Sequence, residues 1–384
     1  MAIRSKDRPT SVRMKDEPLK PDLVLVLTYV MISAIGLLMI YSATAPWLEA
    51  AGRDPAAELR SQAIFVVIGF IAFAVMSTVD LVEIKGFAGP IYLVSIVPLV
   101  MVLTGLGESE GLAQRWIQLG PIQFQPSEFA KIAVILMVAA LLSNAEVPLK
   151  WNTVARVLVV VGVPAVLIFA QPDLGTTLVF AFVVLTMLFV GGSTMRQLGF
   201  LFVATVVGTV GIFQLGFIKS YQLTRLTAFI DPESHSLDAT YNQVQSEIAI
   251  GSGGLFGKGL FEGSQTNLQF VPVQSSDFIF TAVGEQFGFV GSAIVIVLFG
   301  VLLFRLLMIA TSARSRFAFL VTVGIAAMLA FHIFVNIGMT IRIMPVTGLP
   351  LPFMSAGGTV FVALSASLGL AHSAWIRRNL PVGE

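Results

Sequence analysis

The chain has 384 residues, of which 56% are hydrophobic and only 12% are charged, and its mean hydropathy is +0.89. Soluble domains carry about 25% charged residues, so this chain has too few charges to cover a water-facing surface. The net charge of +1 gives no reason to expect a nucleic-acid partner, and the absence of cysteine excludes disulfides and thiolate metal ligands. The composition predicts an all-α polytopic membrane protein.

The first 20 residues are basic and are followed by an apolar run. That run is too long for the hydrophobic region of a signal peptide, and it has no small-residue cleavage site. Residues 1–20 are therefore predicted to form a cytoplasmic tail.

About 20 apolar residues are needed for a helix to cross the hydrocarbon of a bilayer. By that measure the sequence predicts ten spans, at 22–43, 61–78, 87–105, 127–143, 153–170, 174–191, 197–218, 287–309, 317–340 and 356–376. An even number of spans places both termini on one side of the membrane. Residues 21–380 are interpreted as a single transmembrane domain, because no repeat or linker divides them.

Lysine and arginine are more frequent in the tail and in alternate loops than in the intervening loops, which places the N- and C-termini in the cytoplasm. The long interval between the seventh and eighth spans, residues 219–286, is then extracytoplasmic. Its apolar patches, among them LTAFI and LQFVPV, indicate a folded cap loop and not a disordered linker.

Asp277 lies at the end of this cap loop, where the stretch VPVQSSDFIFTAVGEQFG leads into an apolar run. The carboxylate has two interpretations: it caps the helix that follows, or it is the working group of a site facing water just outside the membrane. Ser275 and Ser276 are available to cap the helix without a charge. The residues alone leave the choice open.

Two more ionisable residues, Glu128 and Lys131, lie at the start of the fourth span in QPSEFAKI. A spacing of three places them on one helix face. Ionisable residues within a membrane usually face the interior of a bundle or a wet cavity. The pair is either a structural ion pair that neutralises itself and holds two helices in register, or part of a site.

Three further positions each have a structural and a functional interpretation. Asp173 precedes the sixth span and is expected to cap it, while Arg115 lies in an outer loop and could bind phosphate. The glycine-rich stretch around Lys258 does not match a phosphate-binding loop, because Ser252 replaces the first glycine and Gly259 the serine or threonine. A structural re-entrant loop is favoured there over direct ligand contact.

Several of these stretches together resemble the SEDS family, the shape, elongation, division and sporulation proteins of bacterial wall synthesis. The matching pieces are QPSEFAKI, QPDLGTTLV, YQLTRLTAFIDP, QSEIAIGSGGLFGKG, DFIFTAVGEQFGFVG and NIGMTIRIMPVTGLPLPFMSAGGT, in the family's order along nearly the whole chain. The last piece is more similar to the rod-shape (RodA) branch than to the division branch.

The resemblance implies a peptidoglycan glycosyltransferase of the bacterial plasma membrane, which polymerises lipid II on the outer leaflet for cell-wall elongation with a class B penicillin-binding transpeptidase as partner. It places the family's essential aspartate on Asp277, the general base, and its intramembrane charges on Glu128 and Lys131. Asp173, Gln245, Ser246 and Lys258 match further family positions. Mg²⁺ or Mn²⁺, with no assigned protein ligands, together with Arg115, Lys258 and Lys131, would stabilise the departing pyrophosphate.

The chain departs from the family pattern in two places. The family's Leu-Pro-Glu-x-His-Thr-Asp-Phe is here Val-Pro-Val-Gln-Ser-Ser-Asp-Phe, so a carboxylate and an imidazole are missing beside Asp277. A tyrosine of the family's Ser-Tyr-Gly-Gly is replaced by Ala356. Two other functions remain: a lipid II flippase, in which Glu128, Lys131 and Asp173 would line a path, and a non-catalytic scaffold for the transpeptidase.

Overall fold

The computed structural model describes residues 20–104, 108–110, 113–120, 122–214, 237–272 and 274–380. The predicted cytoplasmic tail lies outside these residues, except for Lys20, as does the LTAFI patch of the cap loop. The described elements are α1 (Leu23–Ala50), α2 (Ala57–Thr78), α3 (Leu81–Val102), β1 (Glu108–Glu110), β2 (Ala113–Leu119), β3 (Ile122–Phe124), α4 (Pro126–Ser143), α5 (Trp151–Ala170), α6 (Leu174–Gly191), α7 (Met195–Gln214), α9 (Leu237–Ser252), α10 (Ser264–Asn267), α11 (Ile279–Thr311), α12 (Arg316–Thr340) and α13 (Gly358–Ile376).

The prediction of an all-α polytopic membrane protein is confirmed. Within the described ranges, nine helices are long and apolar enough to cross a membrane, and each coincides with a predicted span. The remaining predicted span, 197–218, falls on α7, whose shorter apolar stretch is Met195–Gly208. The eighth span was predicted to begin at 287, but α11 begins at Ile279, because its first turns, which include the polar Glu285 and Gln286, are buried against other parts of the protein.

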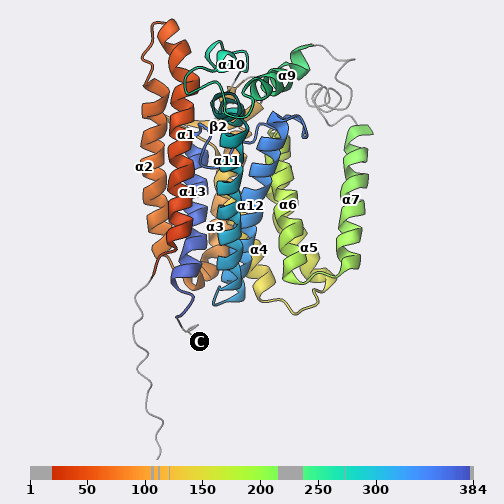
Figure 1. Ribbon diagram of the computed structural model, residues 1–384. Coiled ribbons are helices and arrows are strands. Elements are labelled where there is room, and N and C mark those ends of the chain that lie inside the picture. The colour runs from red at the N-terminus through yellow and green to blue at the C-terminus, as the bar shows by residue number, and fades with distance from the viewer. Residues whose placement is uncertain are drawn as a thin grey trace, which may run out of the picture.

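The helices form one bundle with α12 at its centre (Figure 1). Most of α12 is buried, since α4, α6, α11 and α13 surround it. Helix α2 packs along α13, where Gly69 leaves room for the ring of Phe361, and Gly369 for the backbone of Phe73. Small residues let membrane helices approach this closely. Helix α7 stands at the edge of the bundle in Figure 1.

Helices α9 and α10 lie over one end of the bundle, which is called the cap end below (Figure 1). The short antiparallel sheet β1-β2-β3 lies between α3 and α4 in the chain and was not predicted. Thr359 at the start of α13 donates a hydrogen bond to the carbonyl of Gln123 in β3, which fixes the sheet to the bundle. Helix α13 ends at the opposite end of the bundle, which is called the terminal end below.

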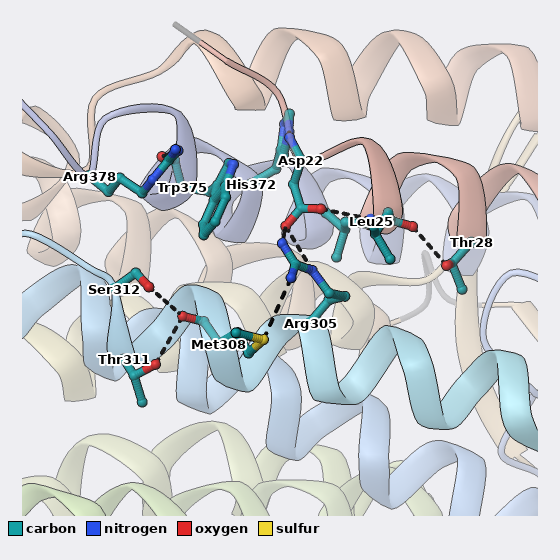
Figure 2. Close-up of polar contacts among 11 residues, drawn as sticks. Asp22, Leu25, Thr28, Arg305, Met308, Thr311, Ser312, His372, Trp375 and Arg378 are labelled. Atoms are coloured by element: carbon teal, nitrogen blue, oxygen red, sulfur yellow. Dashed lines mark hydrogen bonds and ion pairs between the residues drawn. The ribbon is translucent and has the colours of Figure 1, made fainter.

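A buried ion pair ties α1 to α11 at the terminal end (Figure 2). The side chain of Asp22 accepts the Leu25 N–H at 3.0 Å, which caps α1, and pairs with Arg305. The Asp22 N–H donates to Nε2 of His372 at 3.0 Å, and the Nδ1–H of that ring therefore faces Ser77 Oγ, also at 3.0 Å. Four helices are thus joined at this end, which holds their ends in register.

Candidate functional site

Asp277 lies at the cap end, two residues before α11. Its side chain is half-buried, and Ser276 Oγ donates to Oδ1 at 3.2 Å. Phe278 occupies the N-cap position of α11 with no side-chain hydrogen bond at that cap among the described residues. Asp277 therefore lies one residue before the N-cap position of α11.

The main chain of Asp277 is held by the central helix. Asn336 of α12 is buried, and its Nδ2 donates to the carbonyls of Asp277 and Leu349, each at 2.8 Å. One amide thus joins the Asp277 segment to the loop between α12 and α13. That loop passes the carboxylate at Gly348, where an added Cβ would lie 3.6 Å from Asp277 Oδ2. Gly348 has a φ of +72°, a conformation that favours glycine.

Glu128 and Lys131 form the expected intramembrane ion pair. Lys131 Nζ lies 2.8 Å from Glu128 Oε1, and both side chains are only 2% exposed. The same Nζ lies 3.0 Å from Nε2 of His332, a fully buried residue of α12. Since a lysine ammonium only donates, Nε2 accepts and Nδ1 carries the proton, facing the Pro350 carbonyl at 3.3 Å.

These contacts connect the pair to the Asp277 segment. His332 and Asn336 are one turn apart on α12, and they bond the carbonyls of the adjacent residues Pro350 and Leu349. The chain of contacts therefore runs from Glu128 and Lys131 of α4, through α12 and the 349–350 loop, to the backbone of Asp277. The contacts agree with the structural interpretation of the pair, and its role in the site stays a prediction.

Asp173 caps α6, as predicted. Its Oδ1 accepts the Thr176 N–H at 3.0 Å, and its Oδ2 lies 2.9 Å from the Thr176 hydroxyl. Arg115 of β2 donates to the Pro172 carbonyl at 2.5 Å and lies 3.9 Å from Asp173 Oδ1. The structure thus brings two predicted site residues together at the cap end, and Arg115 Nε is buried with no partner among the described residues.

Ser246 lies at the junction of three helices. It is fully buried on α9, and its hydroxyl lies 2.5 Å from Thr281 Oγ1 of α11 and donates to the Thr340 carbonyl of α12 at 2.8 Å. Gln245 is half-buried beside it. These contacts make Ser246 a residue that docks α9 onto α11 and α12.

Lys258 makes an ion pair with Glu285, a residue that sequence reasoning did not single out. Lys258 Nζ lies 2.8 Å from Glu285 Oε1 and 2.9 Å from Ser264 Oγ. The buried carboxylate of Glu285 also accepts the backbone N–H groups of Gln265 and Thr266, each at 2.9 Å, and the Thr266 hydroxyl at 2.7 Å. Glu285 therefore fixes the 258–266 loop to α11, and Lys258 neutralises its charge.

The glycine-rich segment replaces the hydrogen bonds that α11 loses at a break. Gly288 has non-helical angles, φ 66° and ψ −159°. The carbonyls of Glu285 and Gln286 accept the N–H groups of Lys258 and Gly259 at 3.0 and 3.1 Å. The N–H groups of Phe289 and Val290 donate to the carbonyls of Gly254 and Leu255 at 2.9 and 3.1 Å. The structural interpretation of this stretch thus agrees with its backbone contacts.

Comparison with known proteins shows to which family the chain belongs. Residues 22–379 match the family model described as cell cycle protein, FtsW/RodA/SpoVE. The chain belongs to this family. This confirms the resemblance that its sequence motifs indicated.

Curated family members match over most of their length. The peptidoglycan glycosyltransferase MrdB of Escherichia coli K12 is 38% identical over 343 residues, which cover 89% of this chain and 92% of the relative. Stage V sporulation protein E of Bacillus subtilis 168 is 33% identical over 363 residues, 93% of this chain and 97% of the relative.

Solved structures share the fold. A chain from a peptidoglycan synthase complex that coordinates polymerization and crosslinking superposes with a TM-score of 0.79 and 29% identity, over 94% of this chain and all of that chain. The crystal structure of the Thermus thermophilus rod shape determining protein RodA superposes with a TM-score of 0.70 and 30% identity, over 94% and 99%. The chain is a multi-pass membrane protein of the FtsW/RodA/SpoVE family.

Sequence reasoning missed the roles of His332 and Asn336 in this family member. A signal was present, because polar side chains are costly inside a membrane span and both lie within the predicted span 317–340. Their hydrogen-bond partners, Lys131 and the 349–350 loop, could not be found from the sequence, because they come from other parts of the chain.

No group of three His, Asp or Glu side chains is close enough to hold a metal ion within the part of the chain that the structure describes.

Proposed function

We propose that this chain is a peptidoglycan glycosyltransferase that polymerises lipid II, with Asp277 as general base. One observation carries the proposal: a half-buried carboxylate lies at the cap end of the bundle, one residue before the N-cap of its helix, on a backbone that Asn336 holds at 2.8 Å. The names of curated relatives, peptidoglycan glycosyltransferases at 33% and 38% identity, support the reaction class.

The reaction joins a sugar hydroxyl of one lipid-linked disaccharide to the anomeric carbon of another. Asp277 takes the proton of that hydroxyl as its oxygen attacks, and the bond between the anomeric carbon and the pyrophosphate oxygen breaks. The lipid pyrophosphate leaves with the electron pair. The sugars are in water and their lipid anchors are in the bilayer, so a base at the cap end of a membrane bundle lies where both can reach it.

Negative charge develops on the departing pyrophosphate and requires cations. Of the three cations predicted for this role, Lys131 is paired with Glu128 and Lys258 with Glu285. Arg115 is held by the Pro172 carbonyl, and its ion pair with Asp173, at 3.9 Å, is longer than the 2.8 Å pairs of the two lysines. Because Arg115 Nε also has no partner among the described residues, we assign Arg115 to the pyrophosphate, while Lys131 and Lys258 support the framework.

A divalent cation, Mg²⁺ or Mn²⁺, remains part of the proposal. Magnesium is commonly bound through one or two carboxylates plus substrate phosphates, and a pyrophosphate supplies such oxygens itself. The chemistry that the cation supplies when bound is stabilisation of the leaving group.

The partner and the orientation are also proposed. A class B penicillin-binding transpeptidase would crosslink the glycan that this chain makes; the similarity to a chain of a peptidoglycan synthase complex supports a partner synthase. We place the cap end outside the cell and both termini in the cytoplasm of a bacterium, following the distribution of lysine and arginine. The rod-shape branch resemblance assigns the enzyme to cell elongation.

Two assays on the same purified protein separate the three functions. Lipid II in detergent, with the transpeptidase partner present, is expected to yield long glycan on a gel. Proteoliposomes loaded with fluorescent lipid II report flipping by quenching from outside. Glycan formation without accelerated flipping supports the proposal; flipping without glycan supports the transporter; neither activity, with partner binding retained, supports the scaffold.

A further inference from the structure

The glycine-rich segment carries an apolar tip that the proposed reaction does not use. Phe256 is 80% exposed and Leu255 is 65% exposed, although both belong to a cap loop that was expected to face water. Lys258, the cation nearest the tip, turns toward the buried carboxylate of Glu285. The tip itself, Gly254 to Gly257, thus consists of two apolar side chains between two glycines and carries no charge.

The position of the tip is fixed by the break in α11. Backbone hydrogen bonds join Gly254 and Leu255 to Phe289 and Val290, as described above. The approach is so close that a Cβ on Gly257 would lie 2.1 Å from the Gln286 carbonyl oxygen, and one on Gly253 would lie 2.0 Å from that of Gly284. The tip is thus attached to α11 through its backbone.

The tip continues a lipid-facing stripe of α11. Phe289 is 67% exposed, and exposed apolar side chains follow it at helical spacing along the same helix: Val290, Ile294, Val297, Phe304 and Leu307. A membrane helix exposes such a stripe to the hydrocarbon. Because the Val290 N–H donates to the Leu255 carbonyl, the exposed residues Leu255 and Phe256 lie next to the cap end of the stripe.

The length of α11 places this junction at the membrane boundary. Its 33 residues correspond to about 50 Å, whereas the hydrocarbon is about 30 Å thick. The part after the break, Phe289–Thr311, is about 35 Å long at 1.5 Å per residue. Arg305, near its other end, is paired with Asp22 at the terminal end. Gly288 therefore lies close to the hydrocarbon surface at the cap end.

We propose that Leu255 and Phe256 insert into the lipid bilayer at the headgroup boundary and anchor the cap loop there. The occupant of this apolar surface is lipid, because the surface is continuous with the lipid-facing stripe of α11 and is bonded to it. The anchor holds the segment that begins α11, and with it Asp277, at a fixed depth relative to the membrane. This inference does not depend on the proposed reaction.

The chain has no cysteine, so single-cysteine variants accept one nitroxide label without other changes. Labels at Phe256→Cys and Leu255→Cys are compared with Glu262→Cys, an exposed polar position of the same cap, and with Val297→Cys on the stripe. Each protein is placed in nanodiscs at one chain per disc. Power-saturation spectroscopy then measures the accessibility of each label to oxygen, which partitions into lipid, and to a water-soluble nickel chelate.

The expected result is that the labels at 255 and 256 are relaxed more by oxygen than by the nickel chelate, with a ratio between those at 262 and 297. Ratios equal to that at 262 would show a tip in water and overturn the inference. Shielding of both labels from both reagents would also overturn it, since the tip would then be covered by protein. Two tip positions are used so that a local disturbance at one does not decide the outcome.

Discussion

The amide of Asn336 donates a 2.8 Å hydrogen bond to the main-chain carbonyl of Asp277, 59 residues away in the chain. The same amide donates to the carbonyl of Leu349 at 2.8 Å. A residue in the most enclosed part of the bundle therefore sets where the proposed base sits relative to the loop that passes it. A functional group on a loop becomes precise through such a bond to a rigid helix.

Asn336→Leu is expected to reduce glycan synthesis by tenfold or more, because the Asp277 carbonyl and the Leu349 carbonyl both lose a donor. Gln243→Leu is the matched control: Gln243 also donates to two main-chain carbonyls, those of Met339 and Met344, from a buried position. Each loss costs about 1–3 kcal/mol of stability where a carbonyl stays buried, so thermal unfolding should shift similarly in both variants. Equal loss of activity in both would contradict a specific role for Asn336.

The Glu128–Lys131 pair is expected to show strong coupling. Glu128→Gln or Lys131→Met alone leaves one buried charge without its partner, which typically costs about 3–5 kcal/mol, whereas replacing both members of a buried pair is often close to neutral. The double variant Glu128→Gln, Lys131→Met should thus unfold at a higher temperature than either single variant. Additive losses in a double-mutant cycle would show that the two charges do not interact.

His332 should tolerate glutamine better than leucine. A glutamine can accept from Lys131 and donate toward the Pro350 carbonyl, as the imidazole does at 3.0 and 3.3 Å. Leucine fills similar space but leaves the ammonium with one acceptor fewer. The measurement is activity and thermal unfolding of His332→Gln and His332→Leu. A leucine variant as active as the wild type would show that the hydrogen bonds of His332 do not support the site.

Asp80 gives a pH dependence at the terminal end. Burial raises the pKa of its carboxyl, but hydrogen bonds from Arg314 and from the Val82 N–H, with the charges of Arg314 and Arg377, outweigh it and lower the pKa. A lowered folded-state pKa contributes stability that is present above the usual pKa of 3.8 and is lost as pH falls through the folded value. Unfolding temperatures should therefore fall below pH 4 less steeply in Asp80→Asn than in the wild type. If the unfolding temperature falls equally steeply with pH in both proteins, the titration of Asp80 does not contribute to the pH dependence of stability.

The membrane spans could be predicted from the sequence because the thickness of the bilayer requires about 20 apolar residues in any helix that crosses it. The sequence did not predict that α11 begins at Ile279, since Glu285 and Gln286 look like loop residues, and their hydrogen bonds to Lys258, Ser42 and the 264–266 turn are formed only in the fold. The cap of Asp173 was predictable because it is local. The contacts among Asn336, His332, Lys131 and the 349–350 loop could not be predicted, because only the packing of the bundle brings these residues together. The catalytic role of Asp277 and the ligand contacts of the other site residues stay predictions.

Glycan synthesis from lipid II by purified wild type and Asp277→Asn, each with the transpeptidase partner and with or without a metal chelator, shows whether Asp277 is the general base. Ser276→Ala is the control, because it removes the neighbouring hydroxyl that donates to Asp277 Oδ1 at 3.2 Å and keeps the carboxylate. We expect long glycan from wild type and from Ser276→Ala. Asp277→Asn is expected to lose at least a hundredfold in the rate of glycan synthesis, the low end of what a general base contributes. Its unfolding temperature and partner binding should be unchanged. Glycan from Asp277→Asn at the wild-type rate would contradict this role of Asp277.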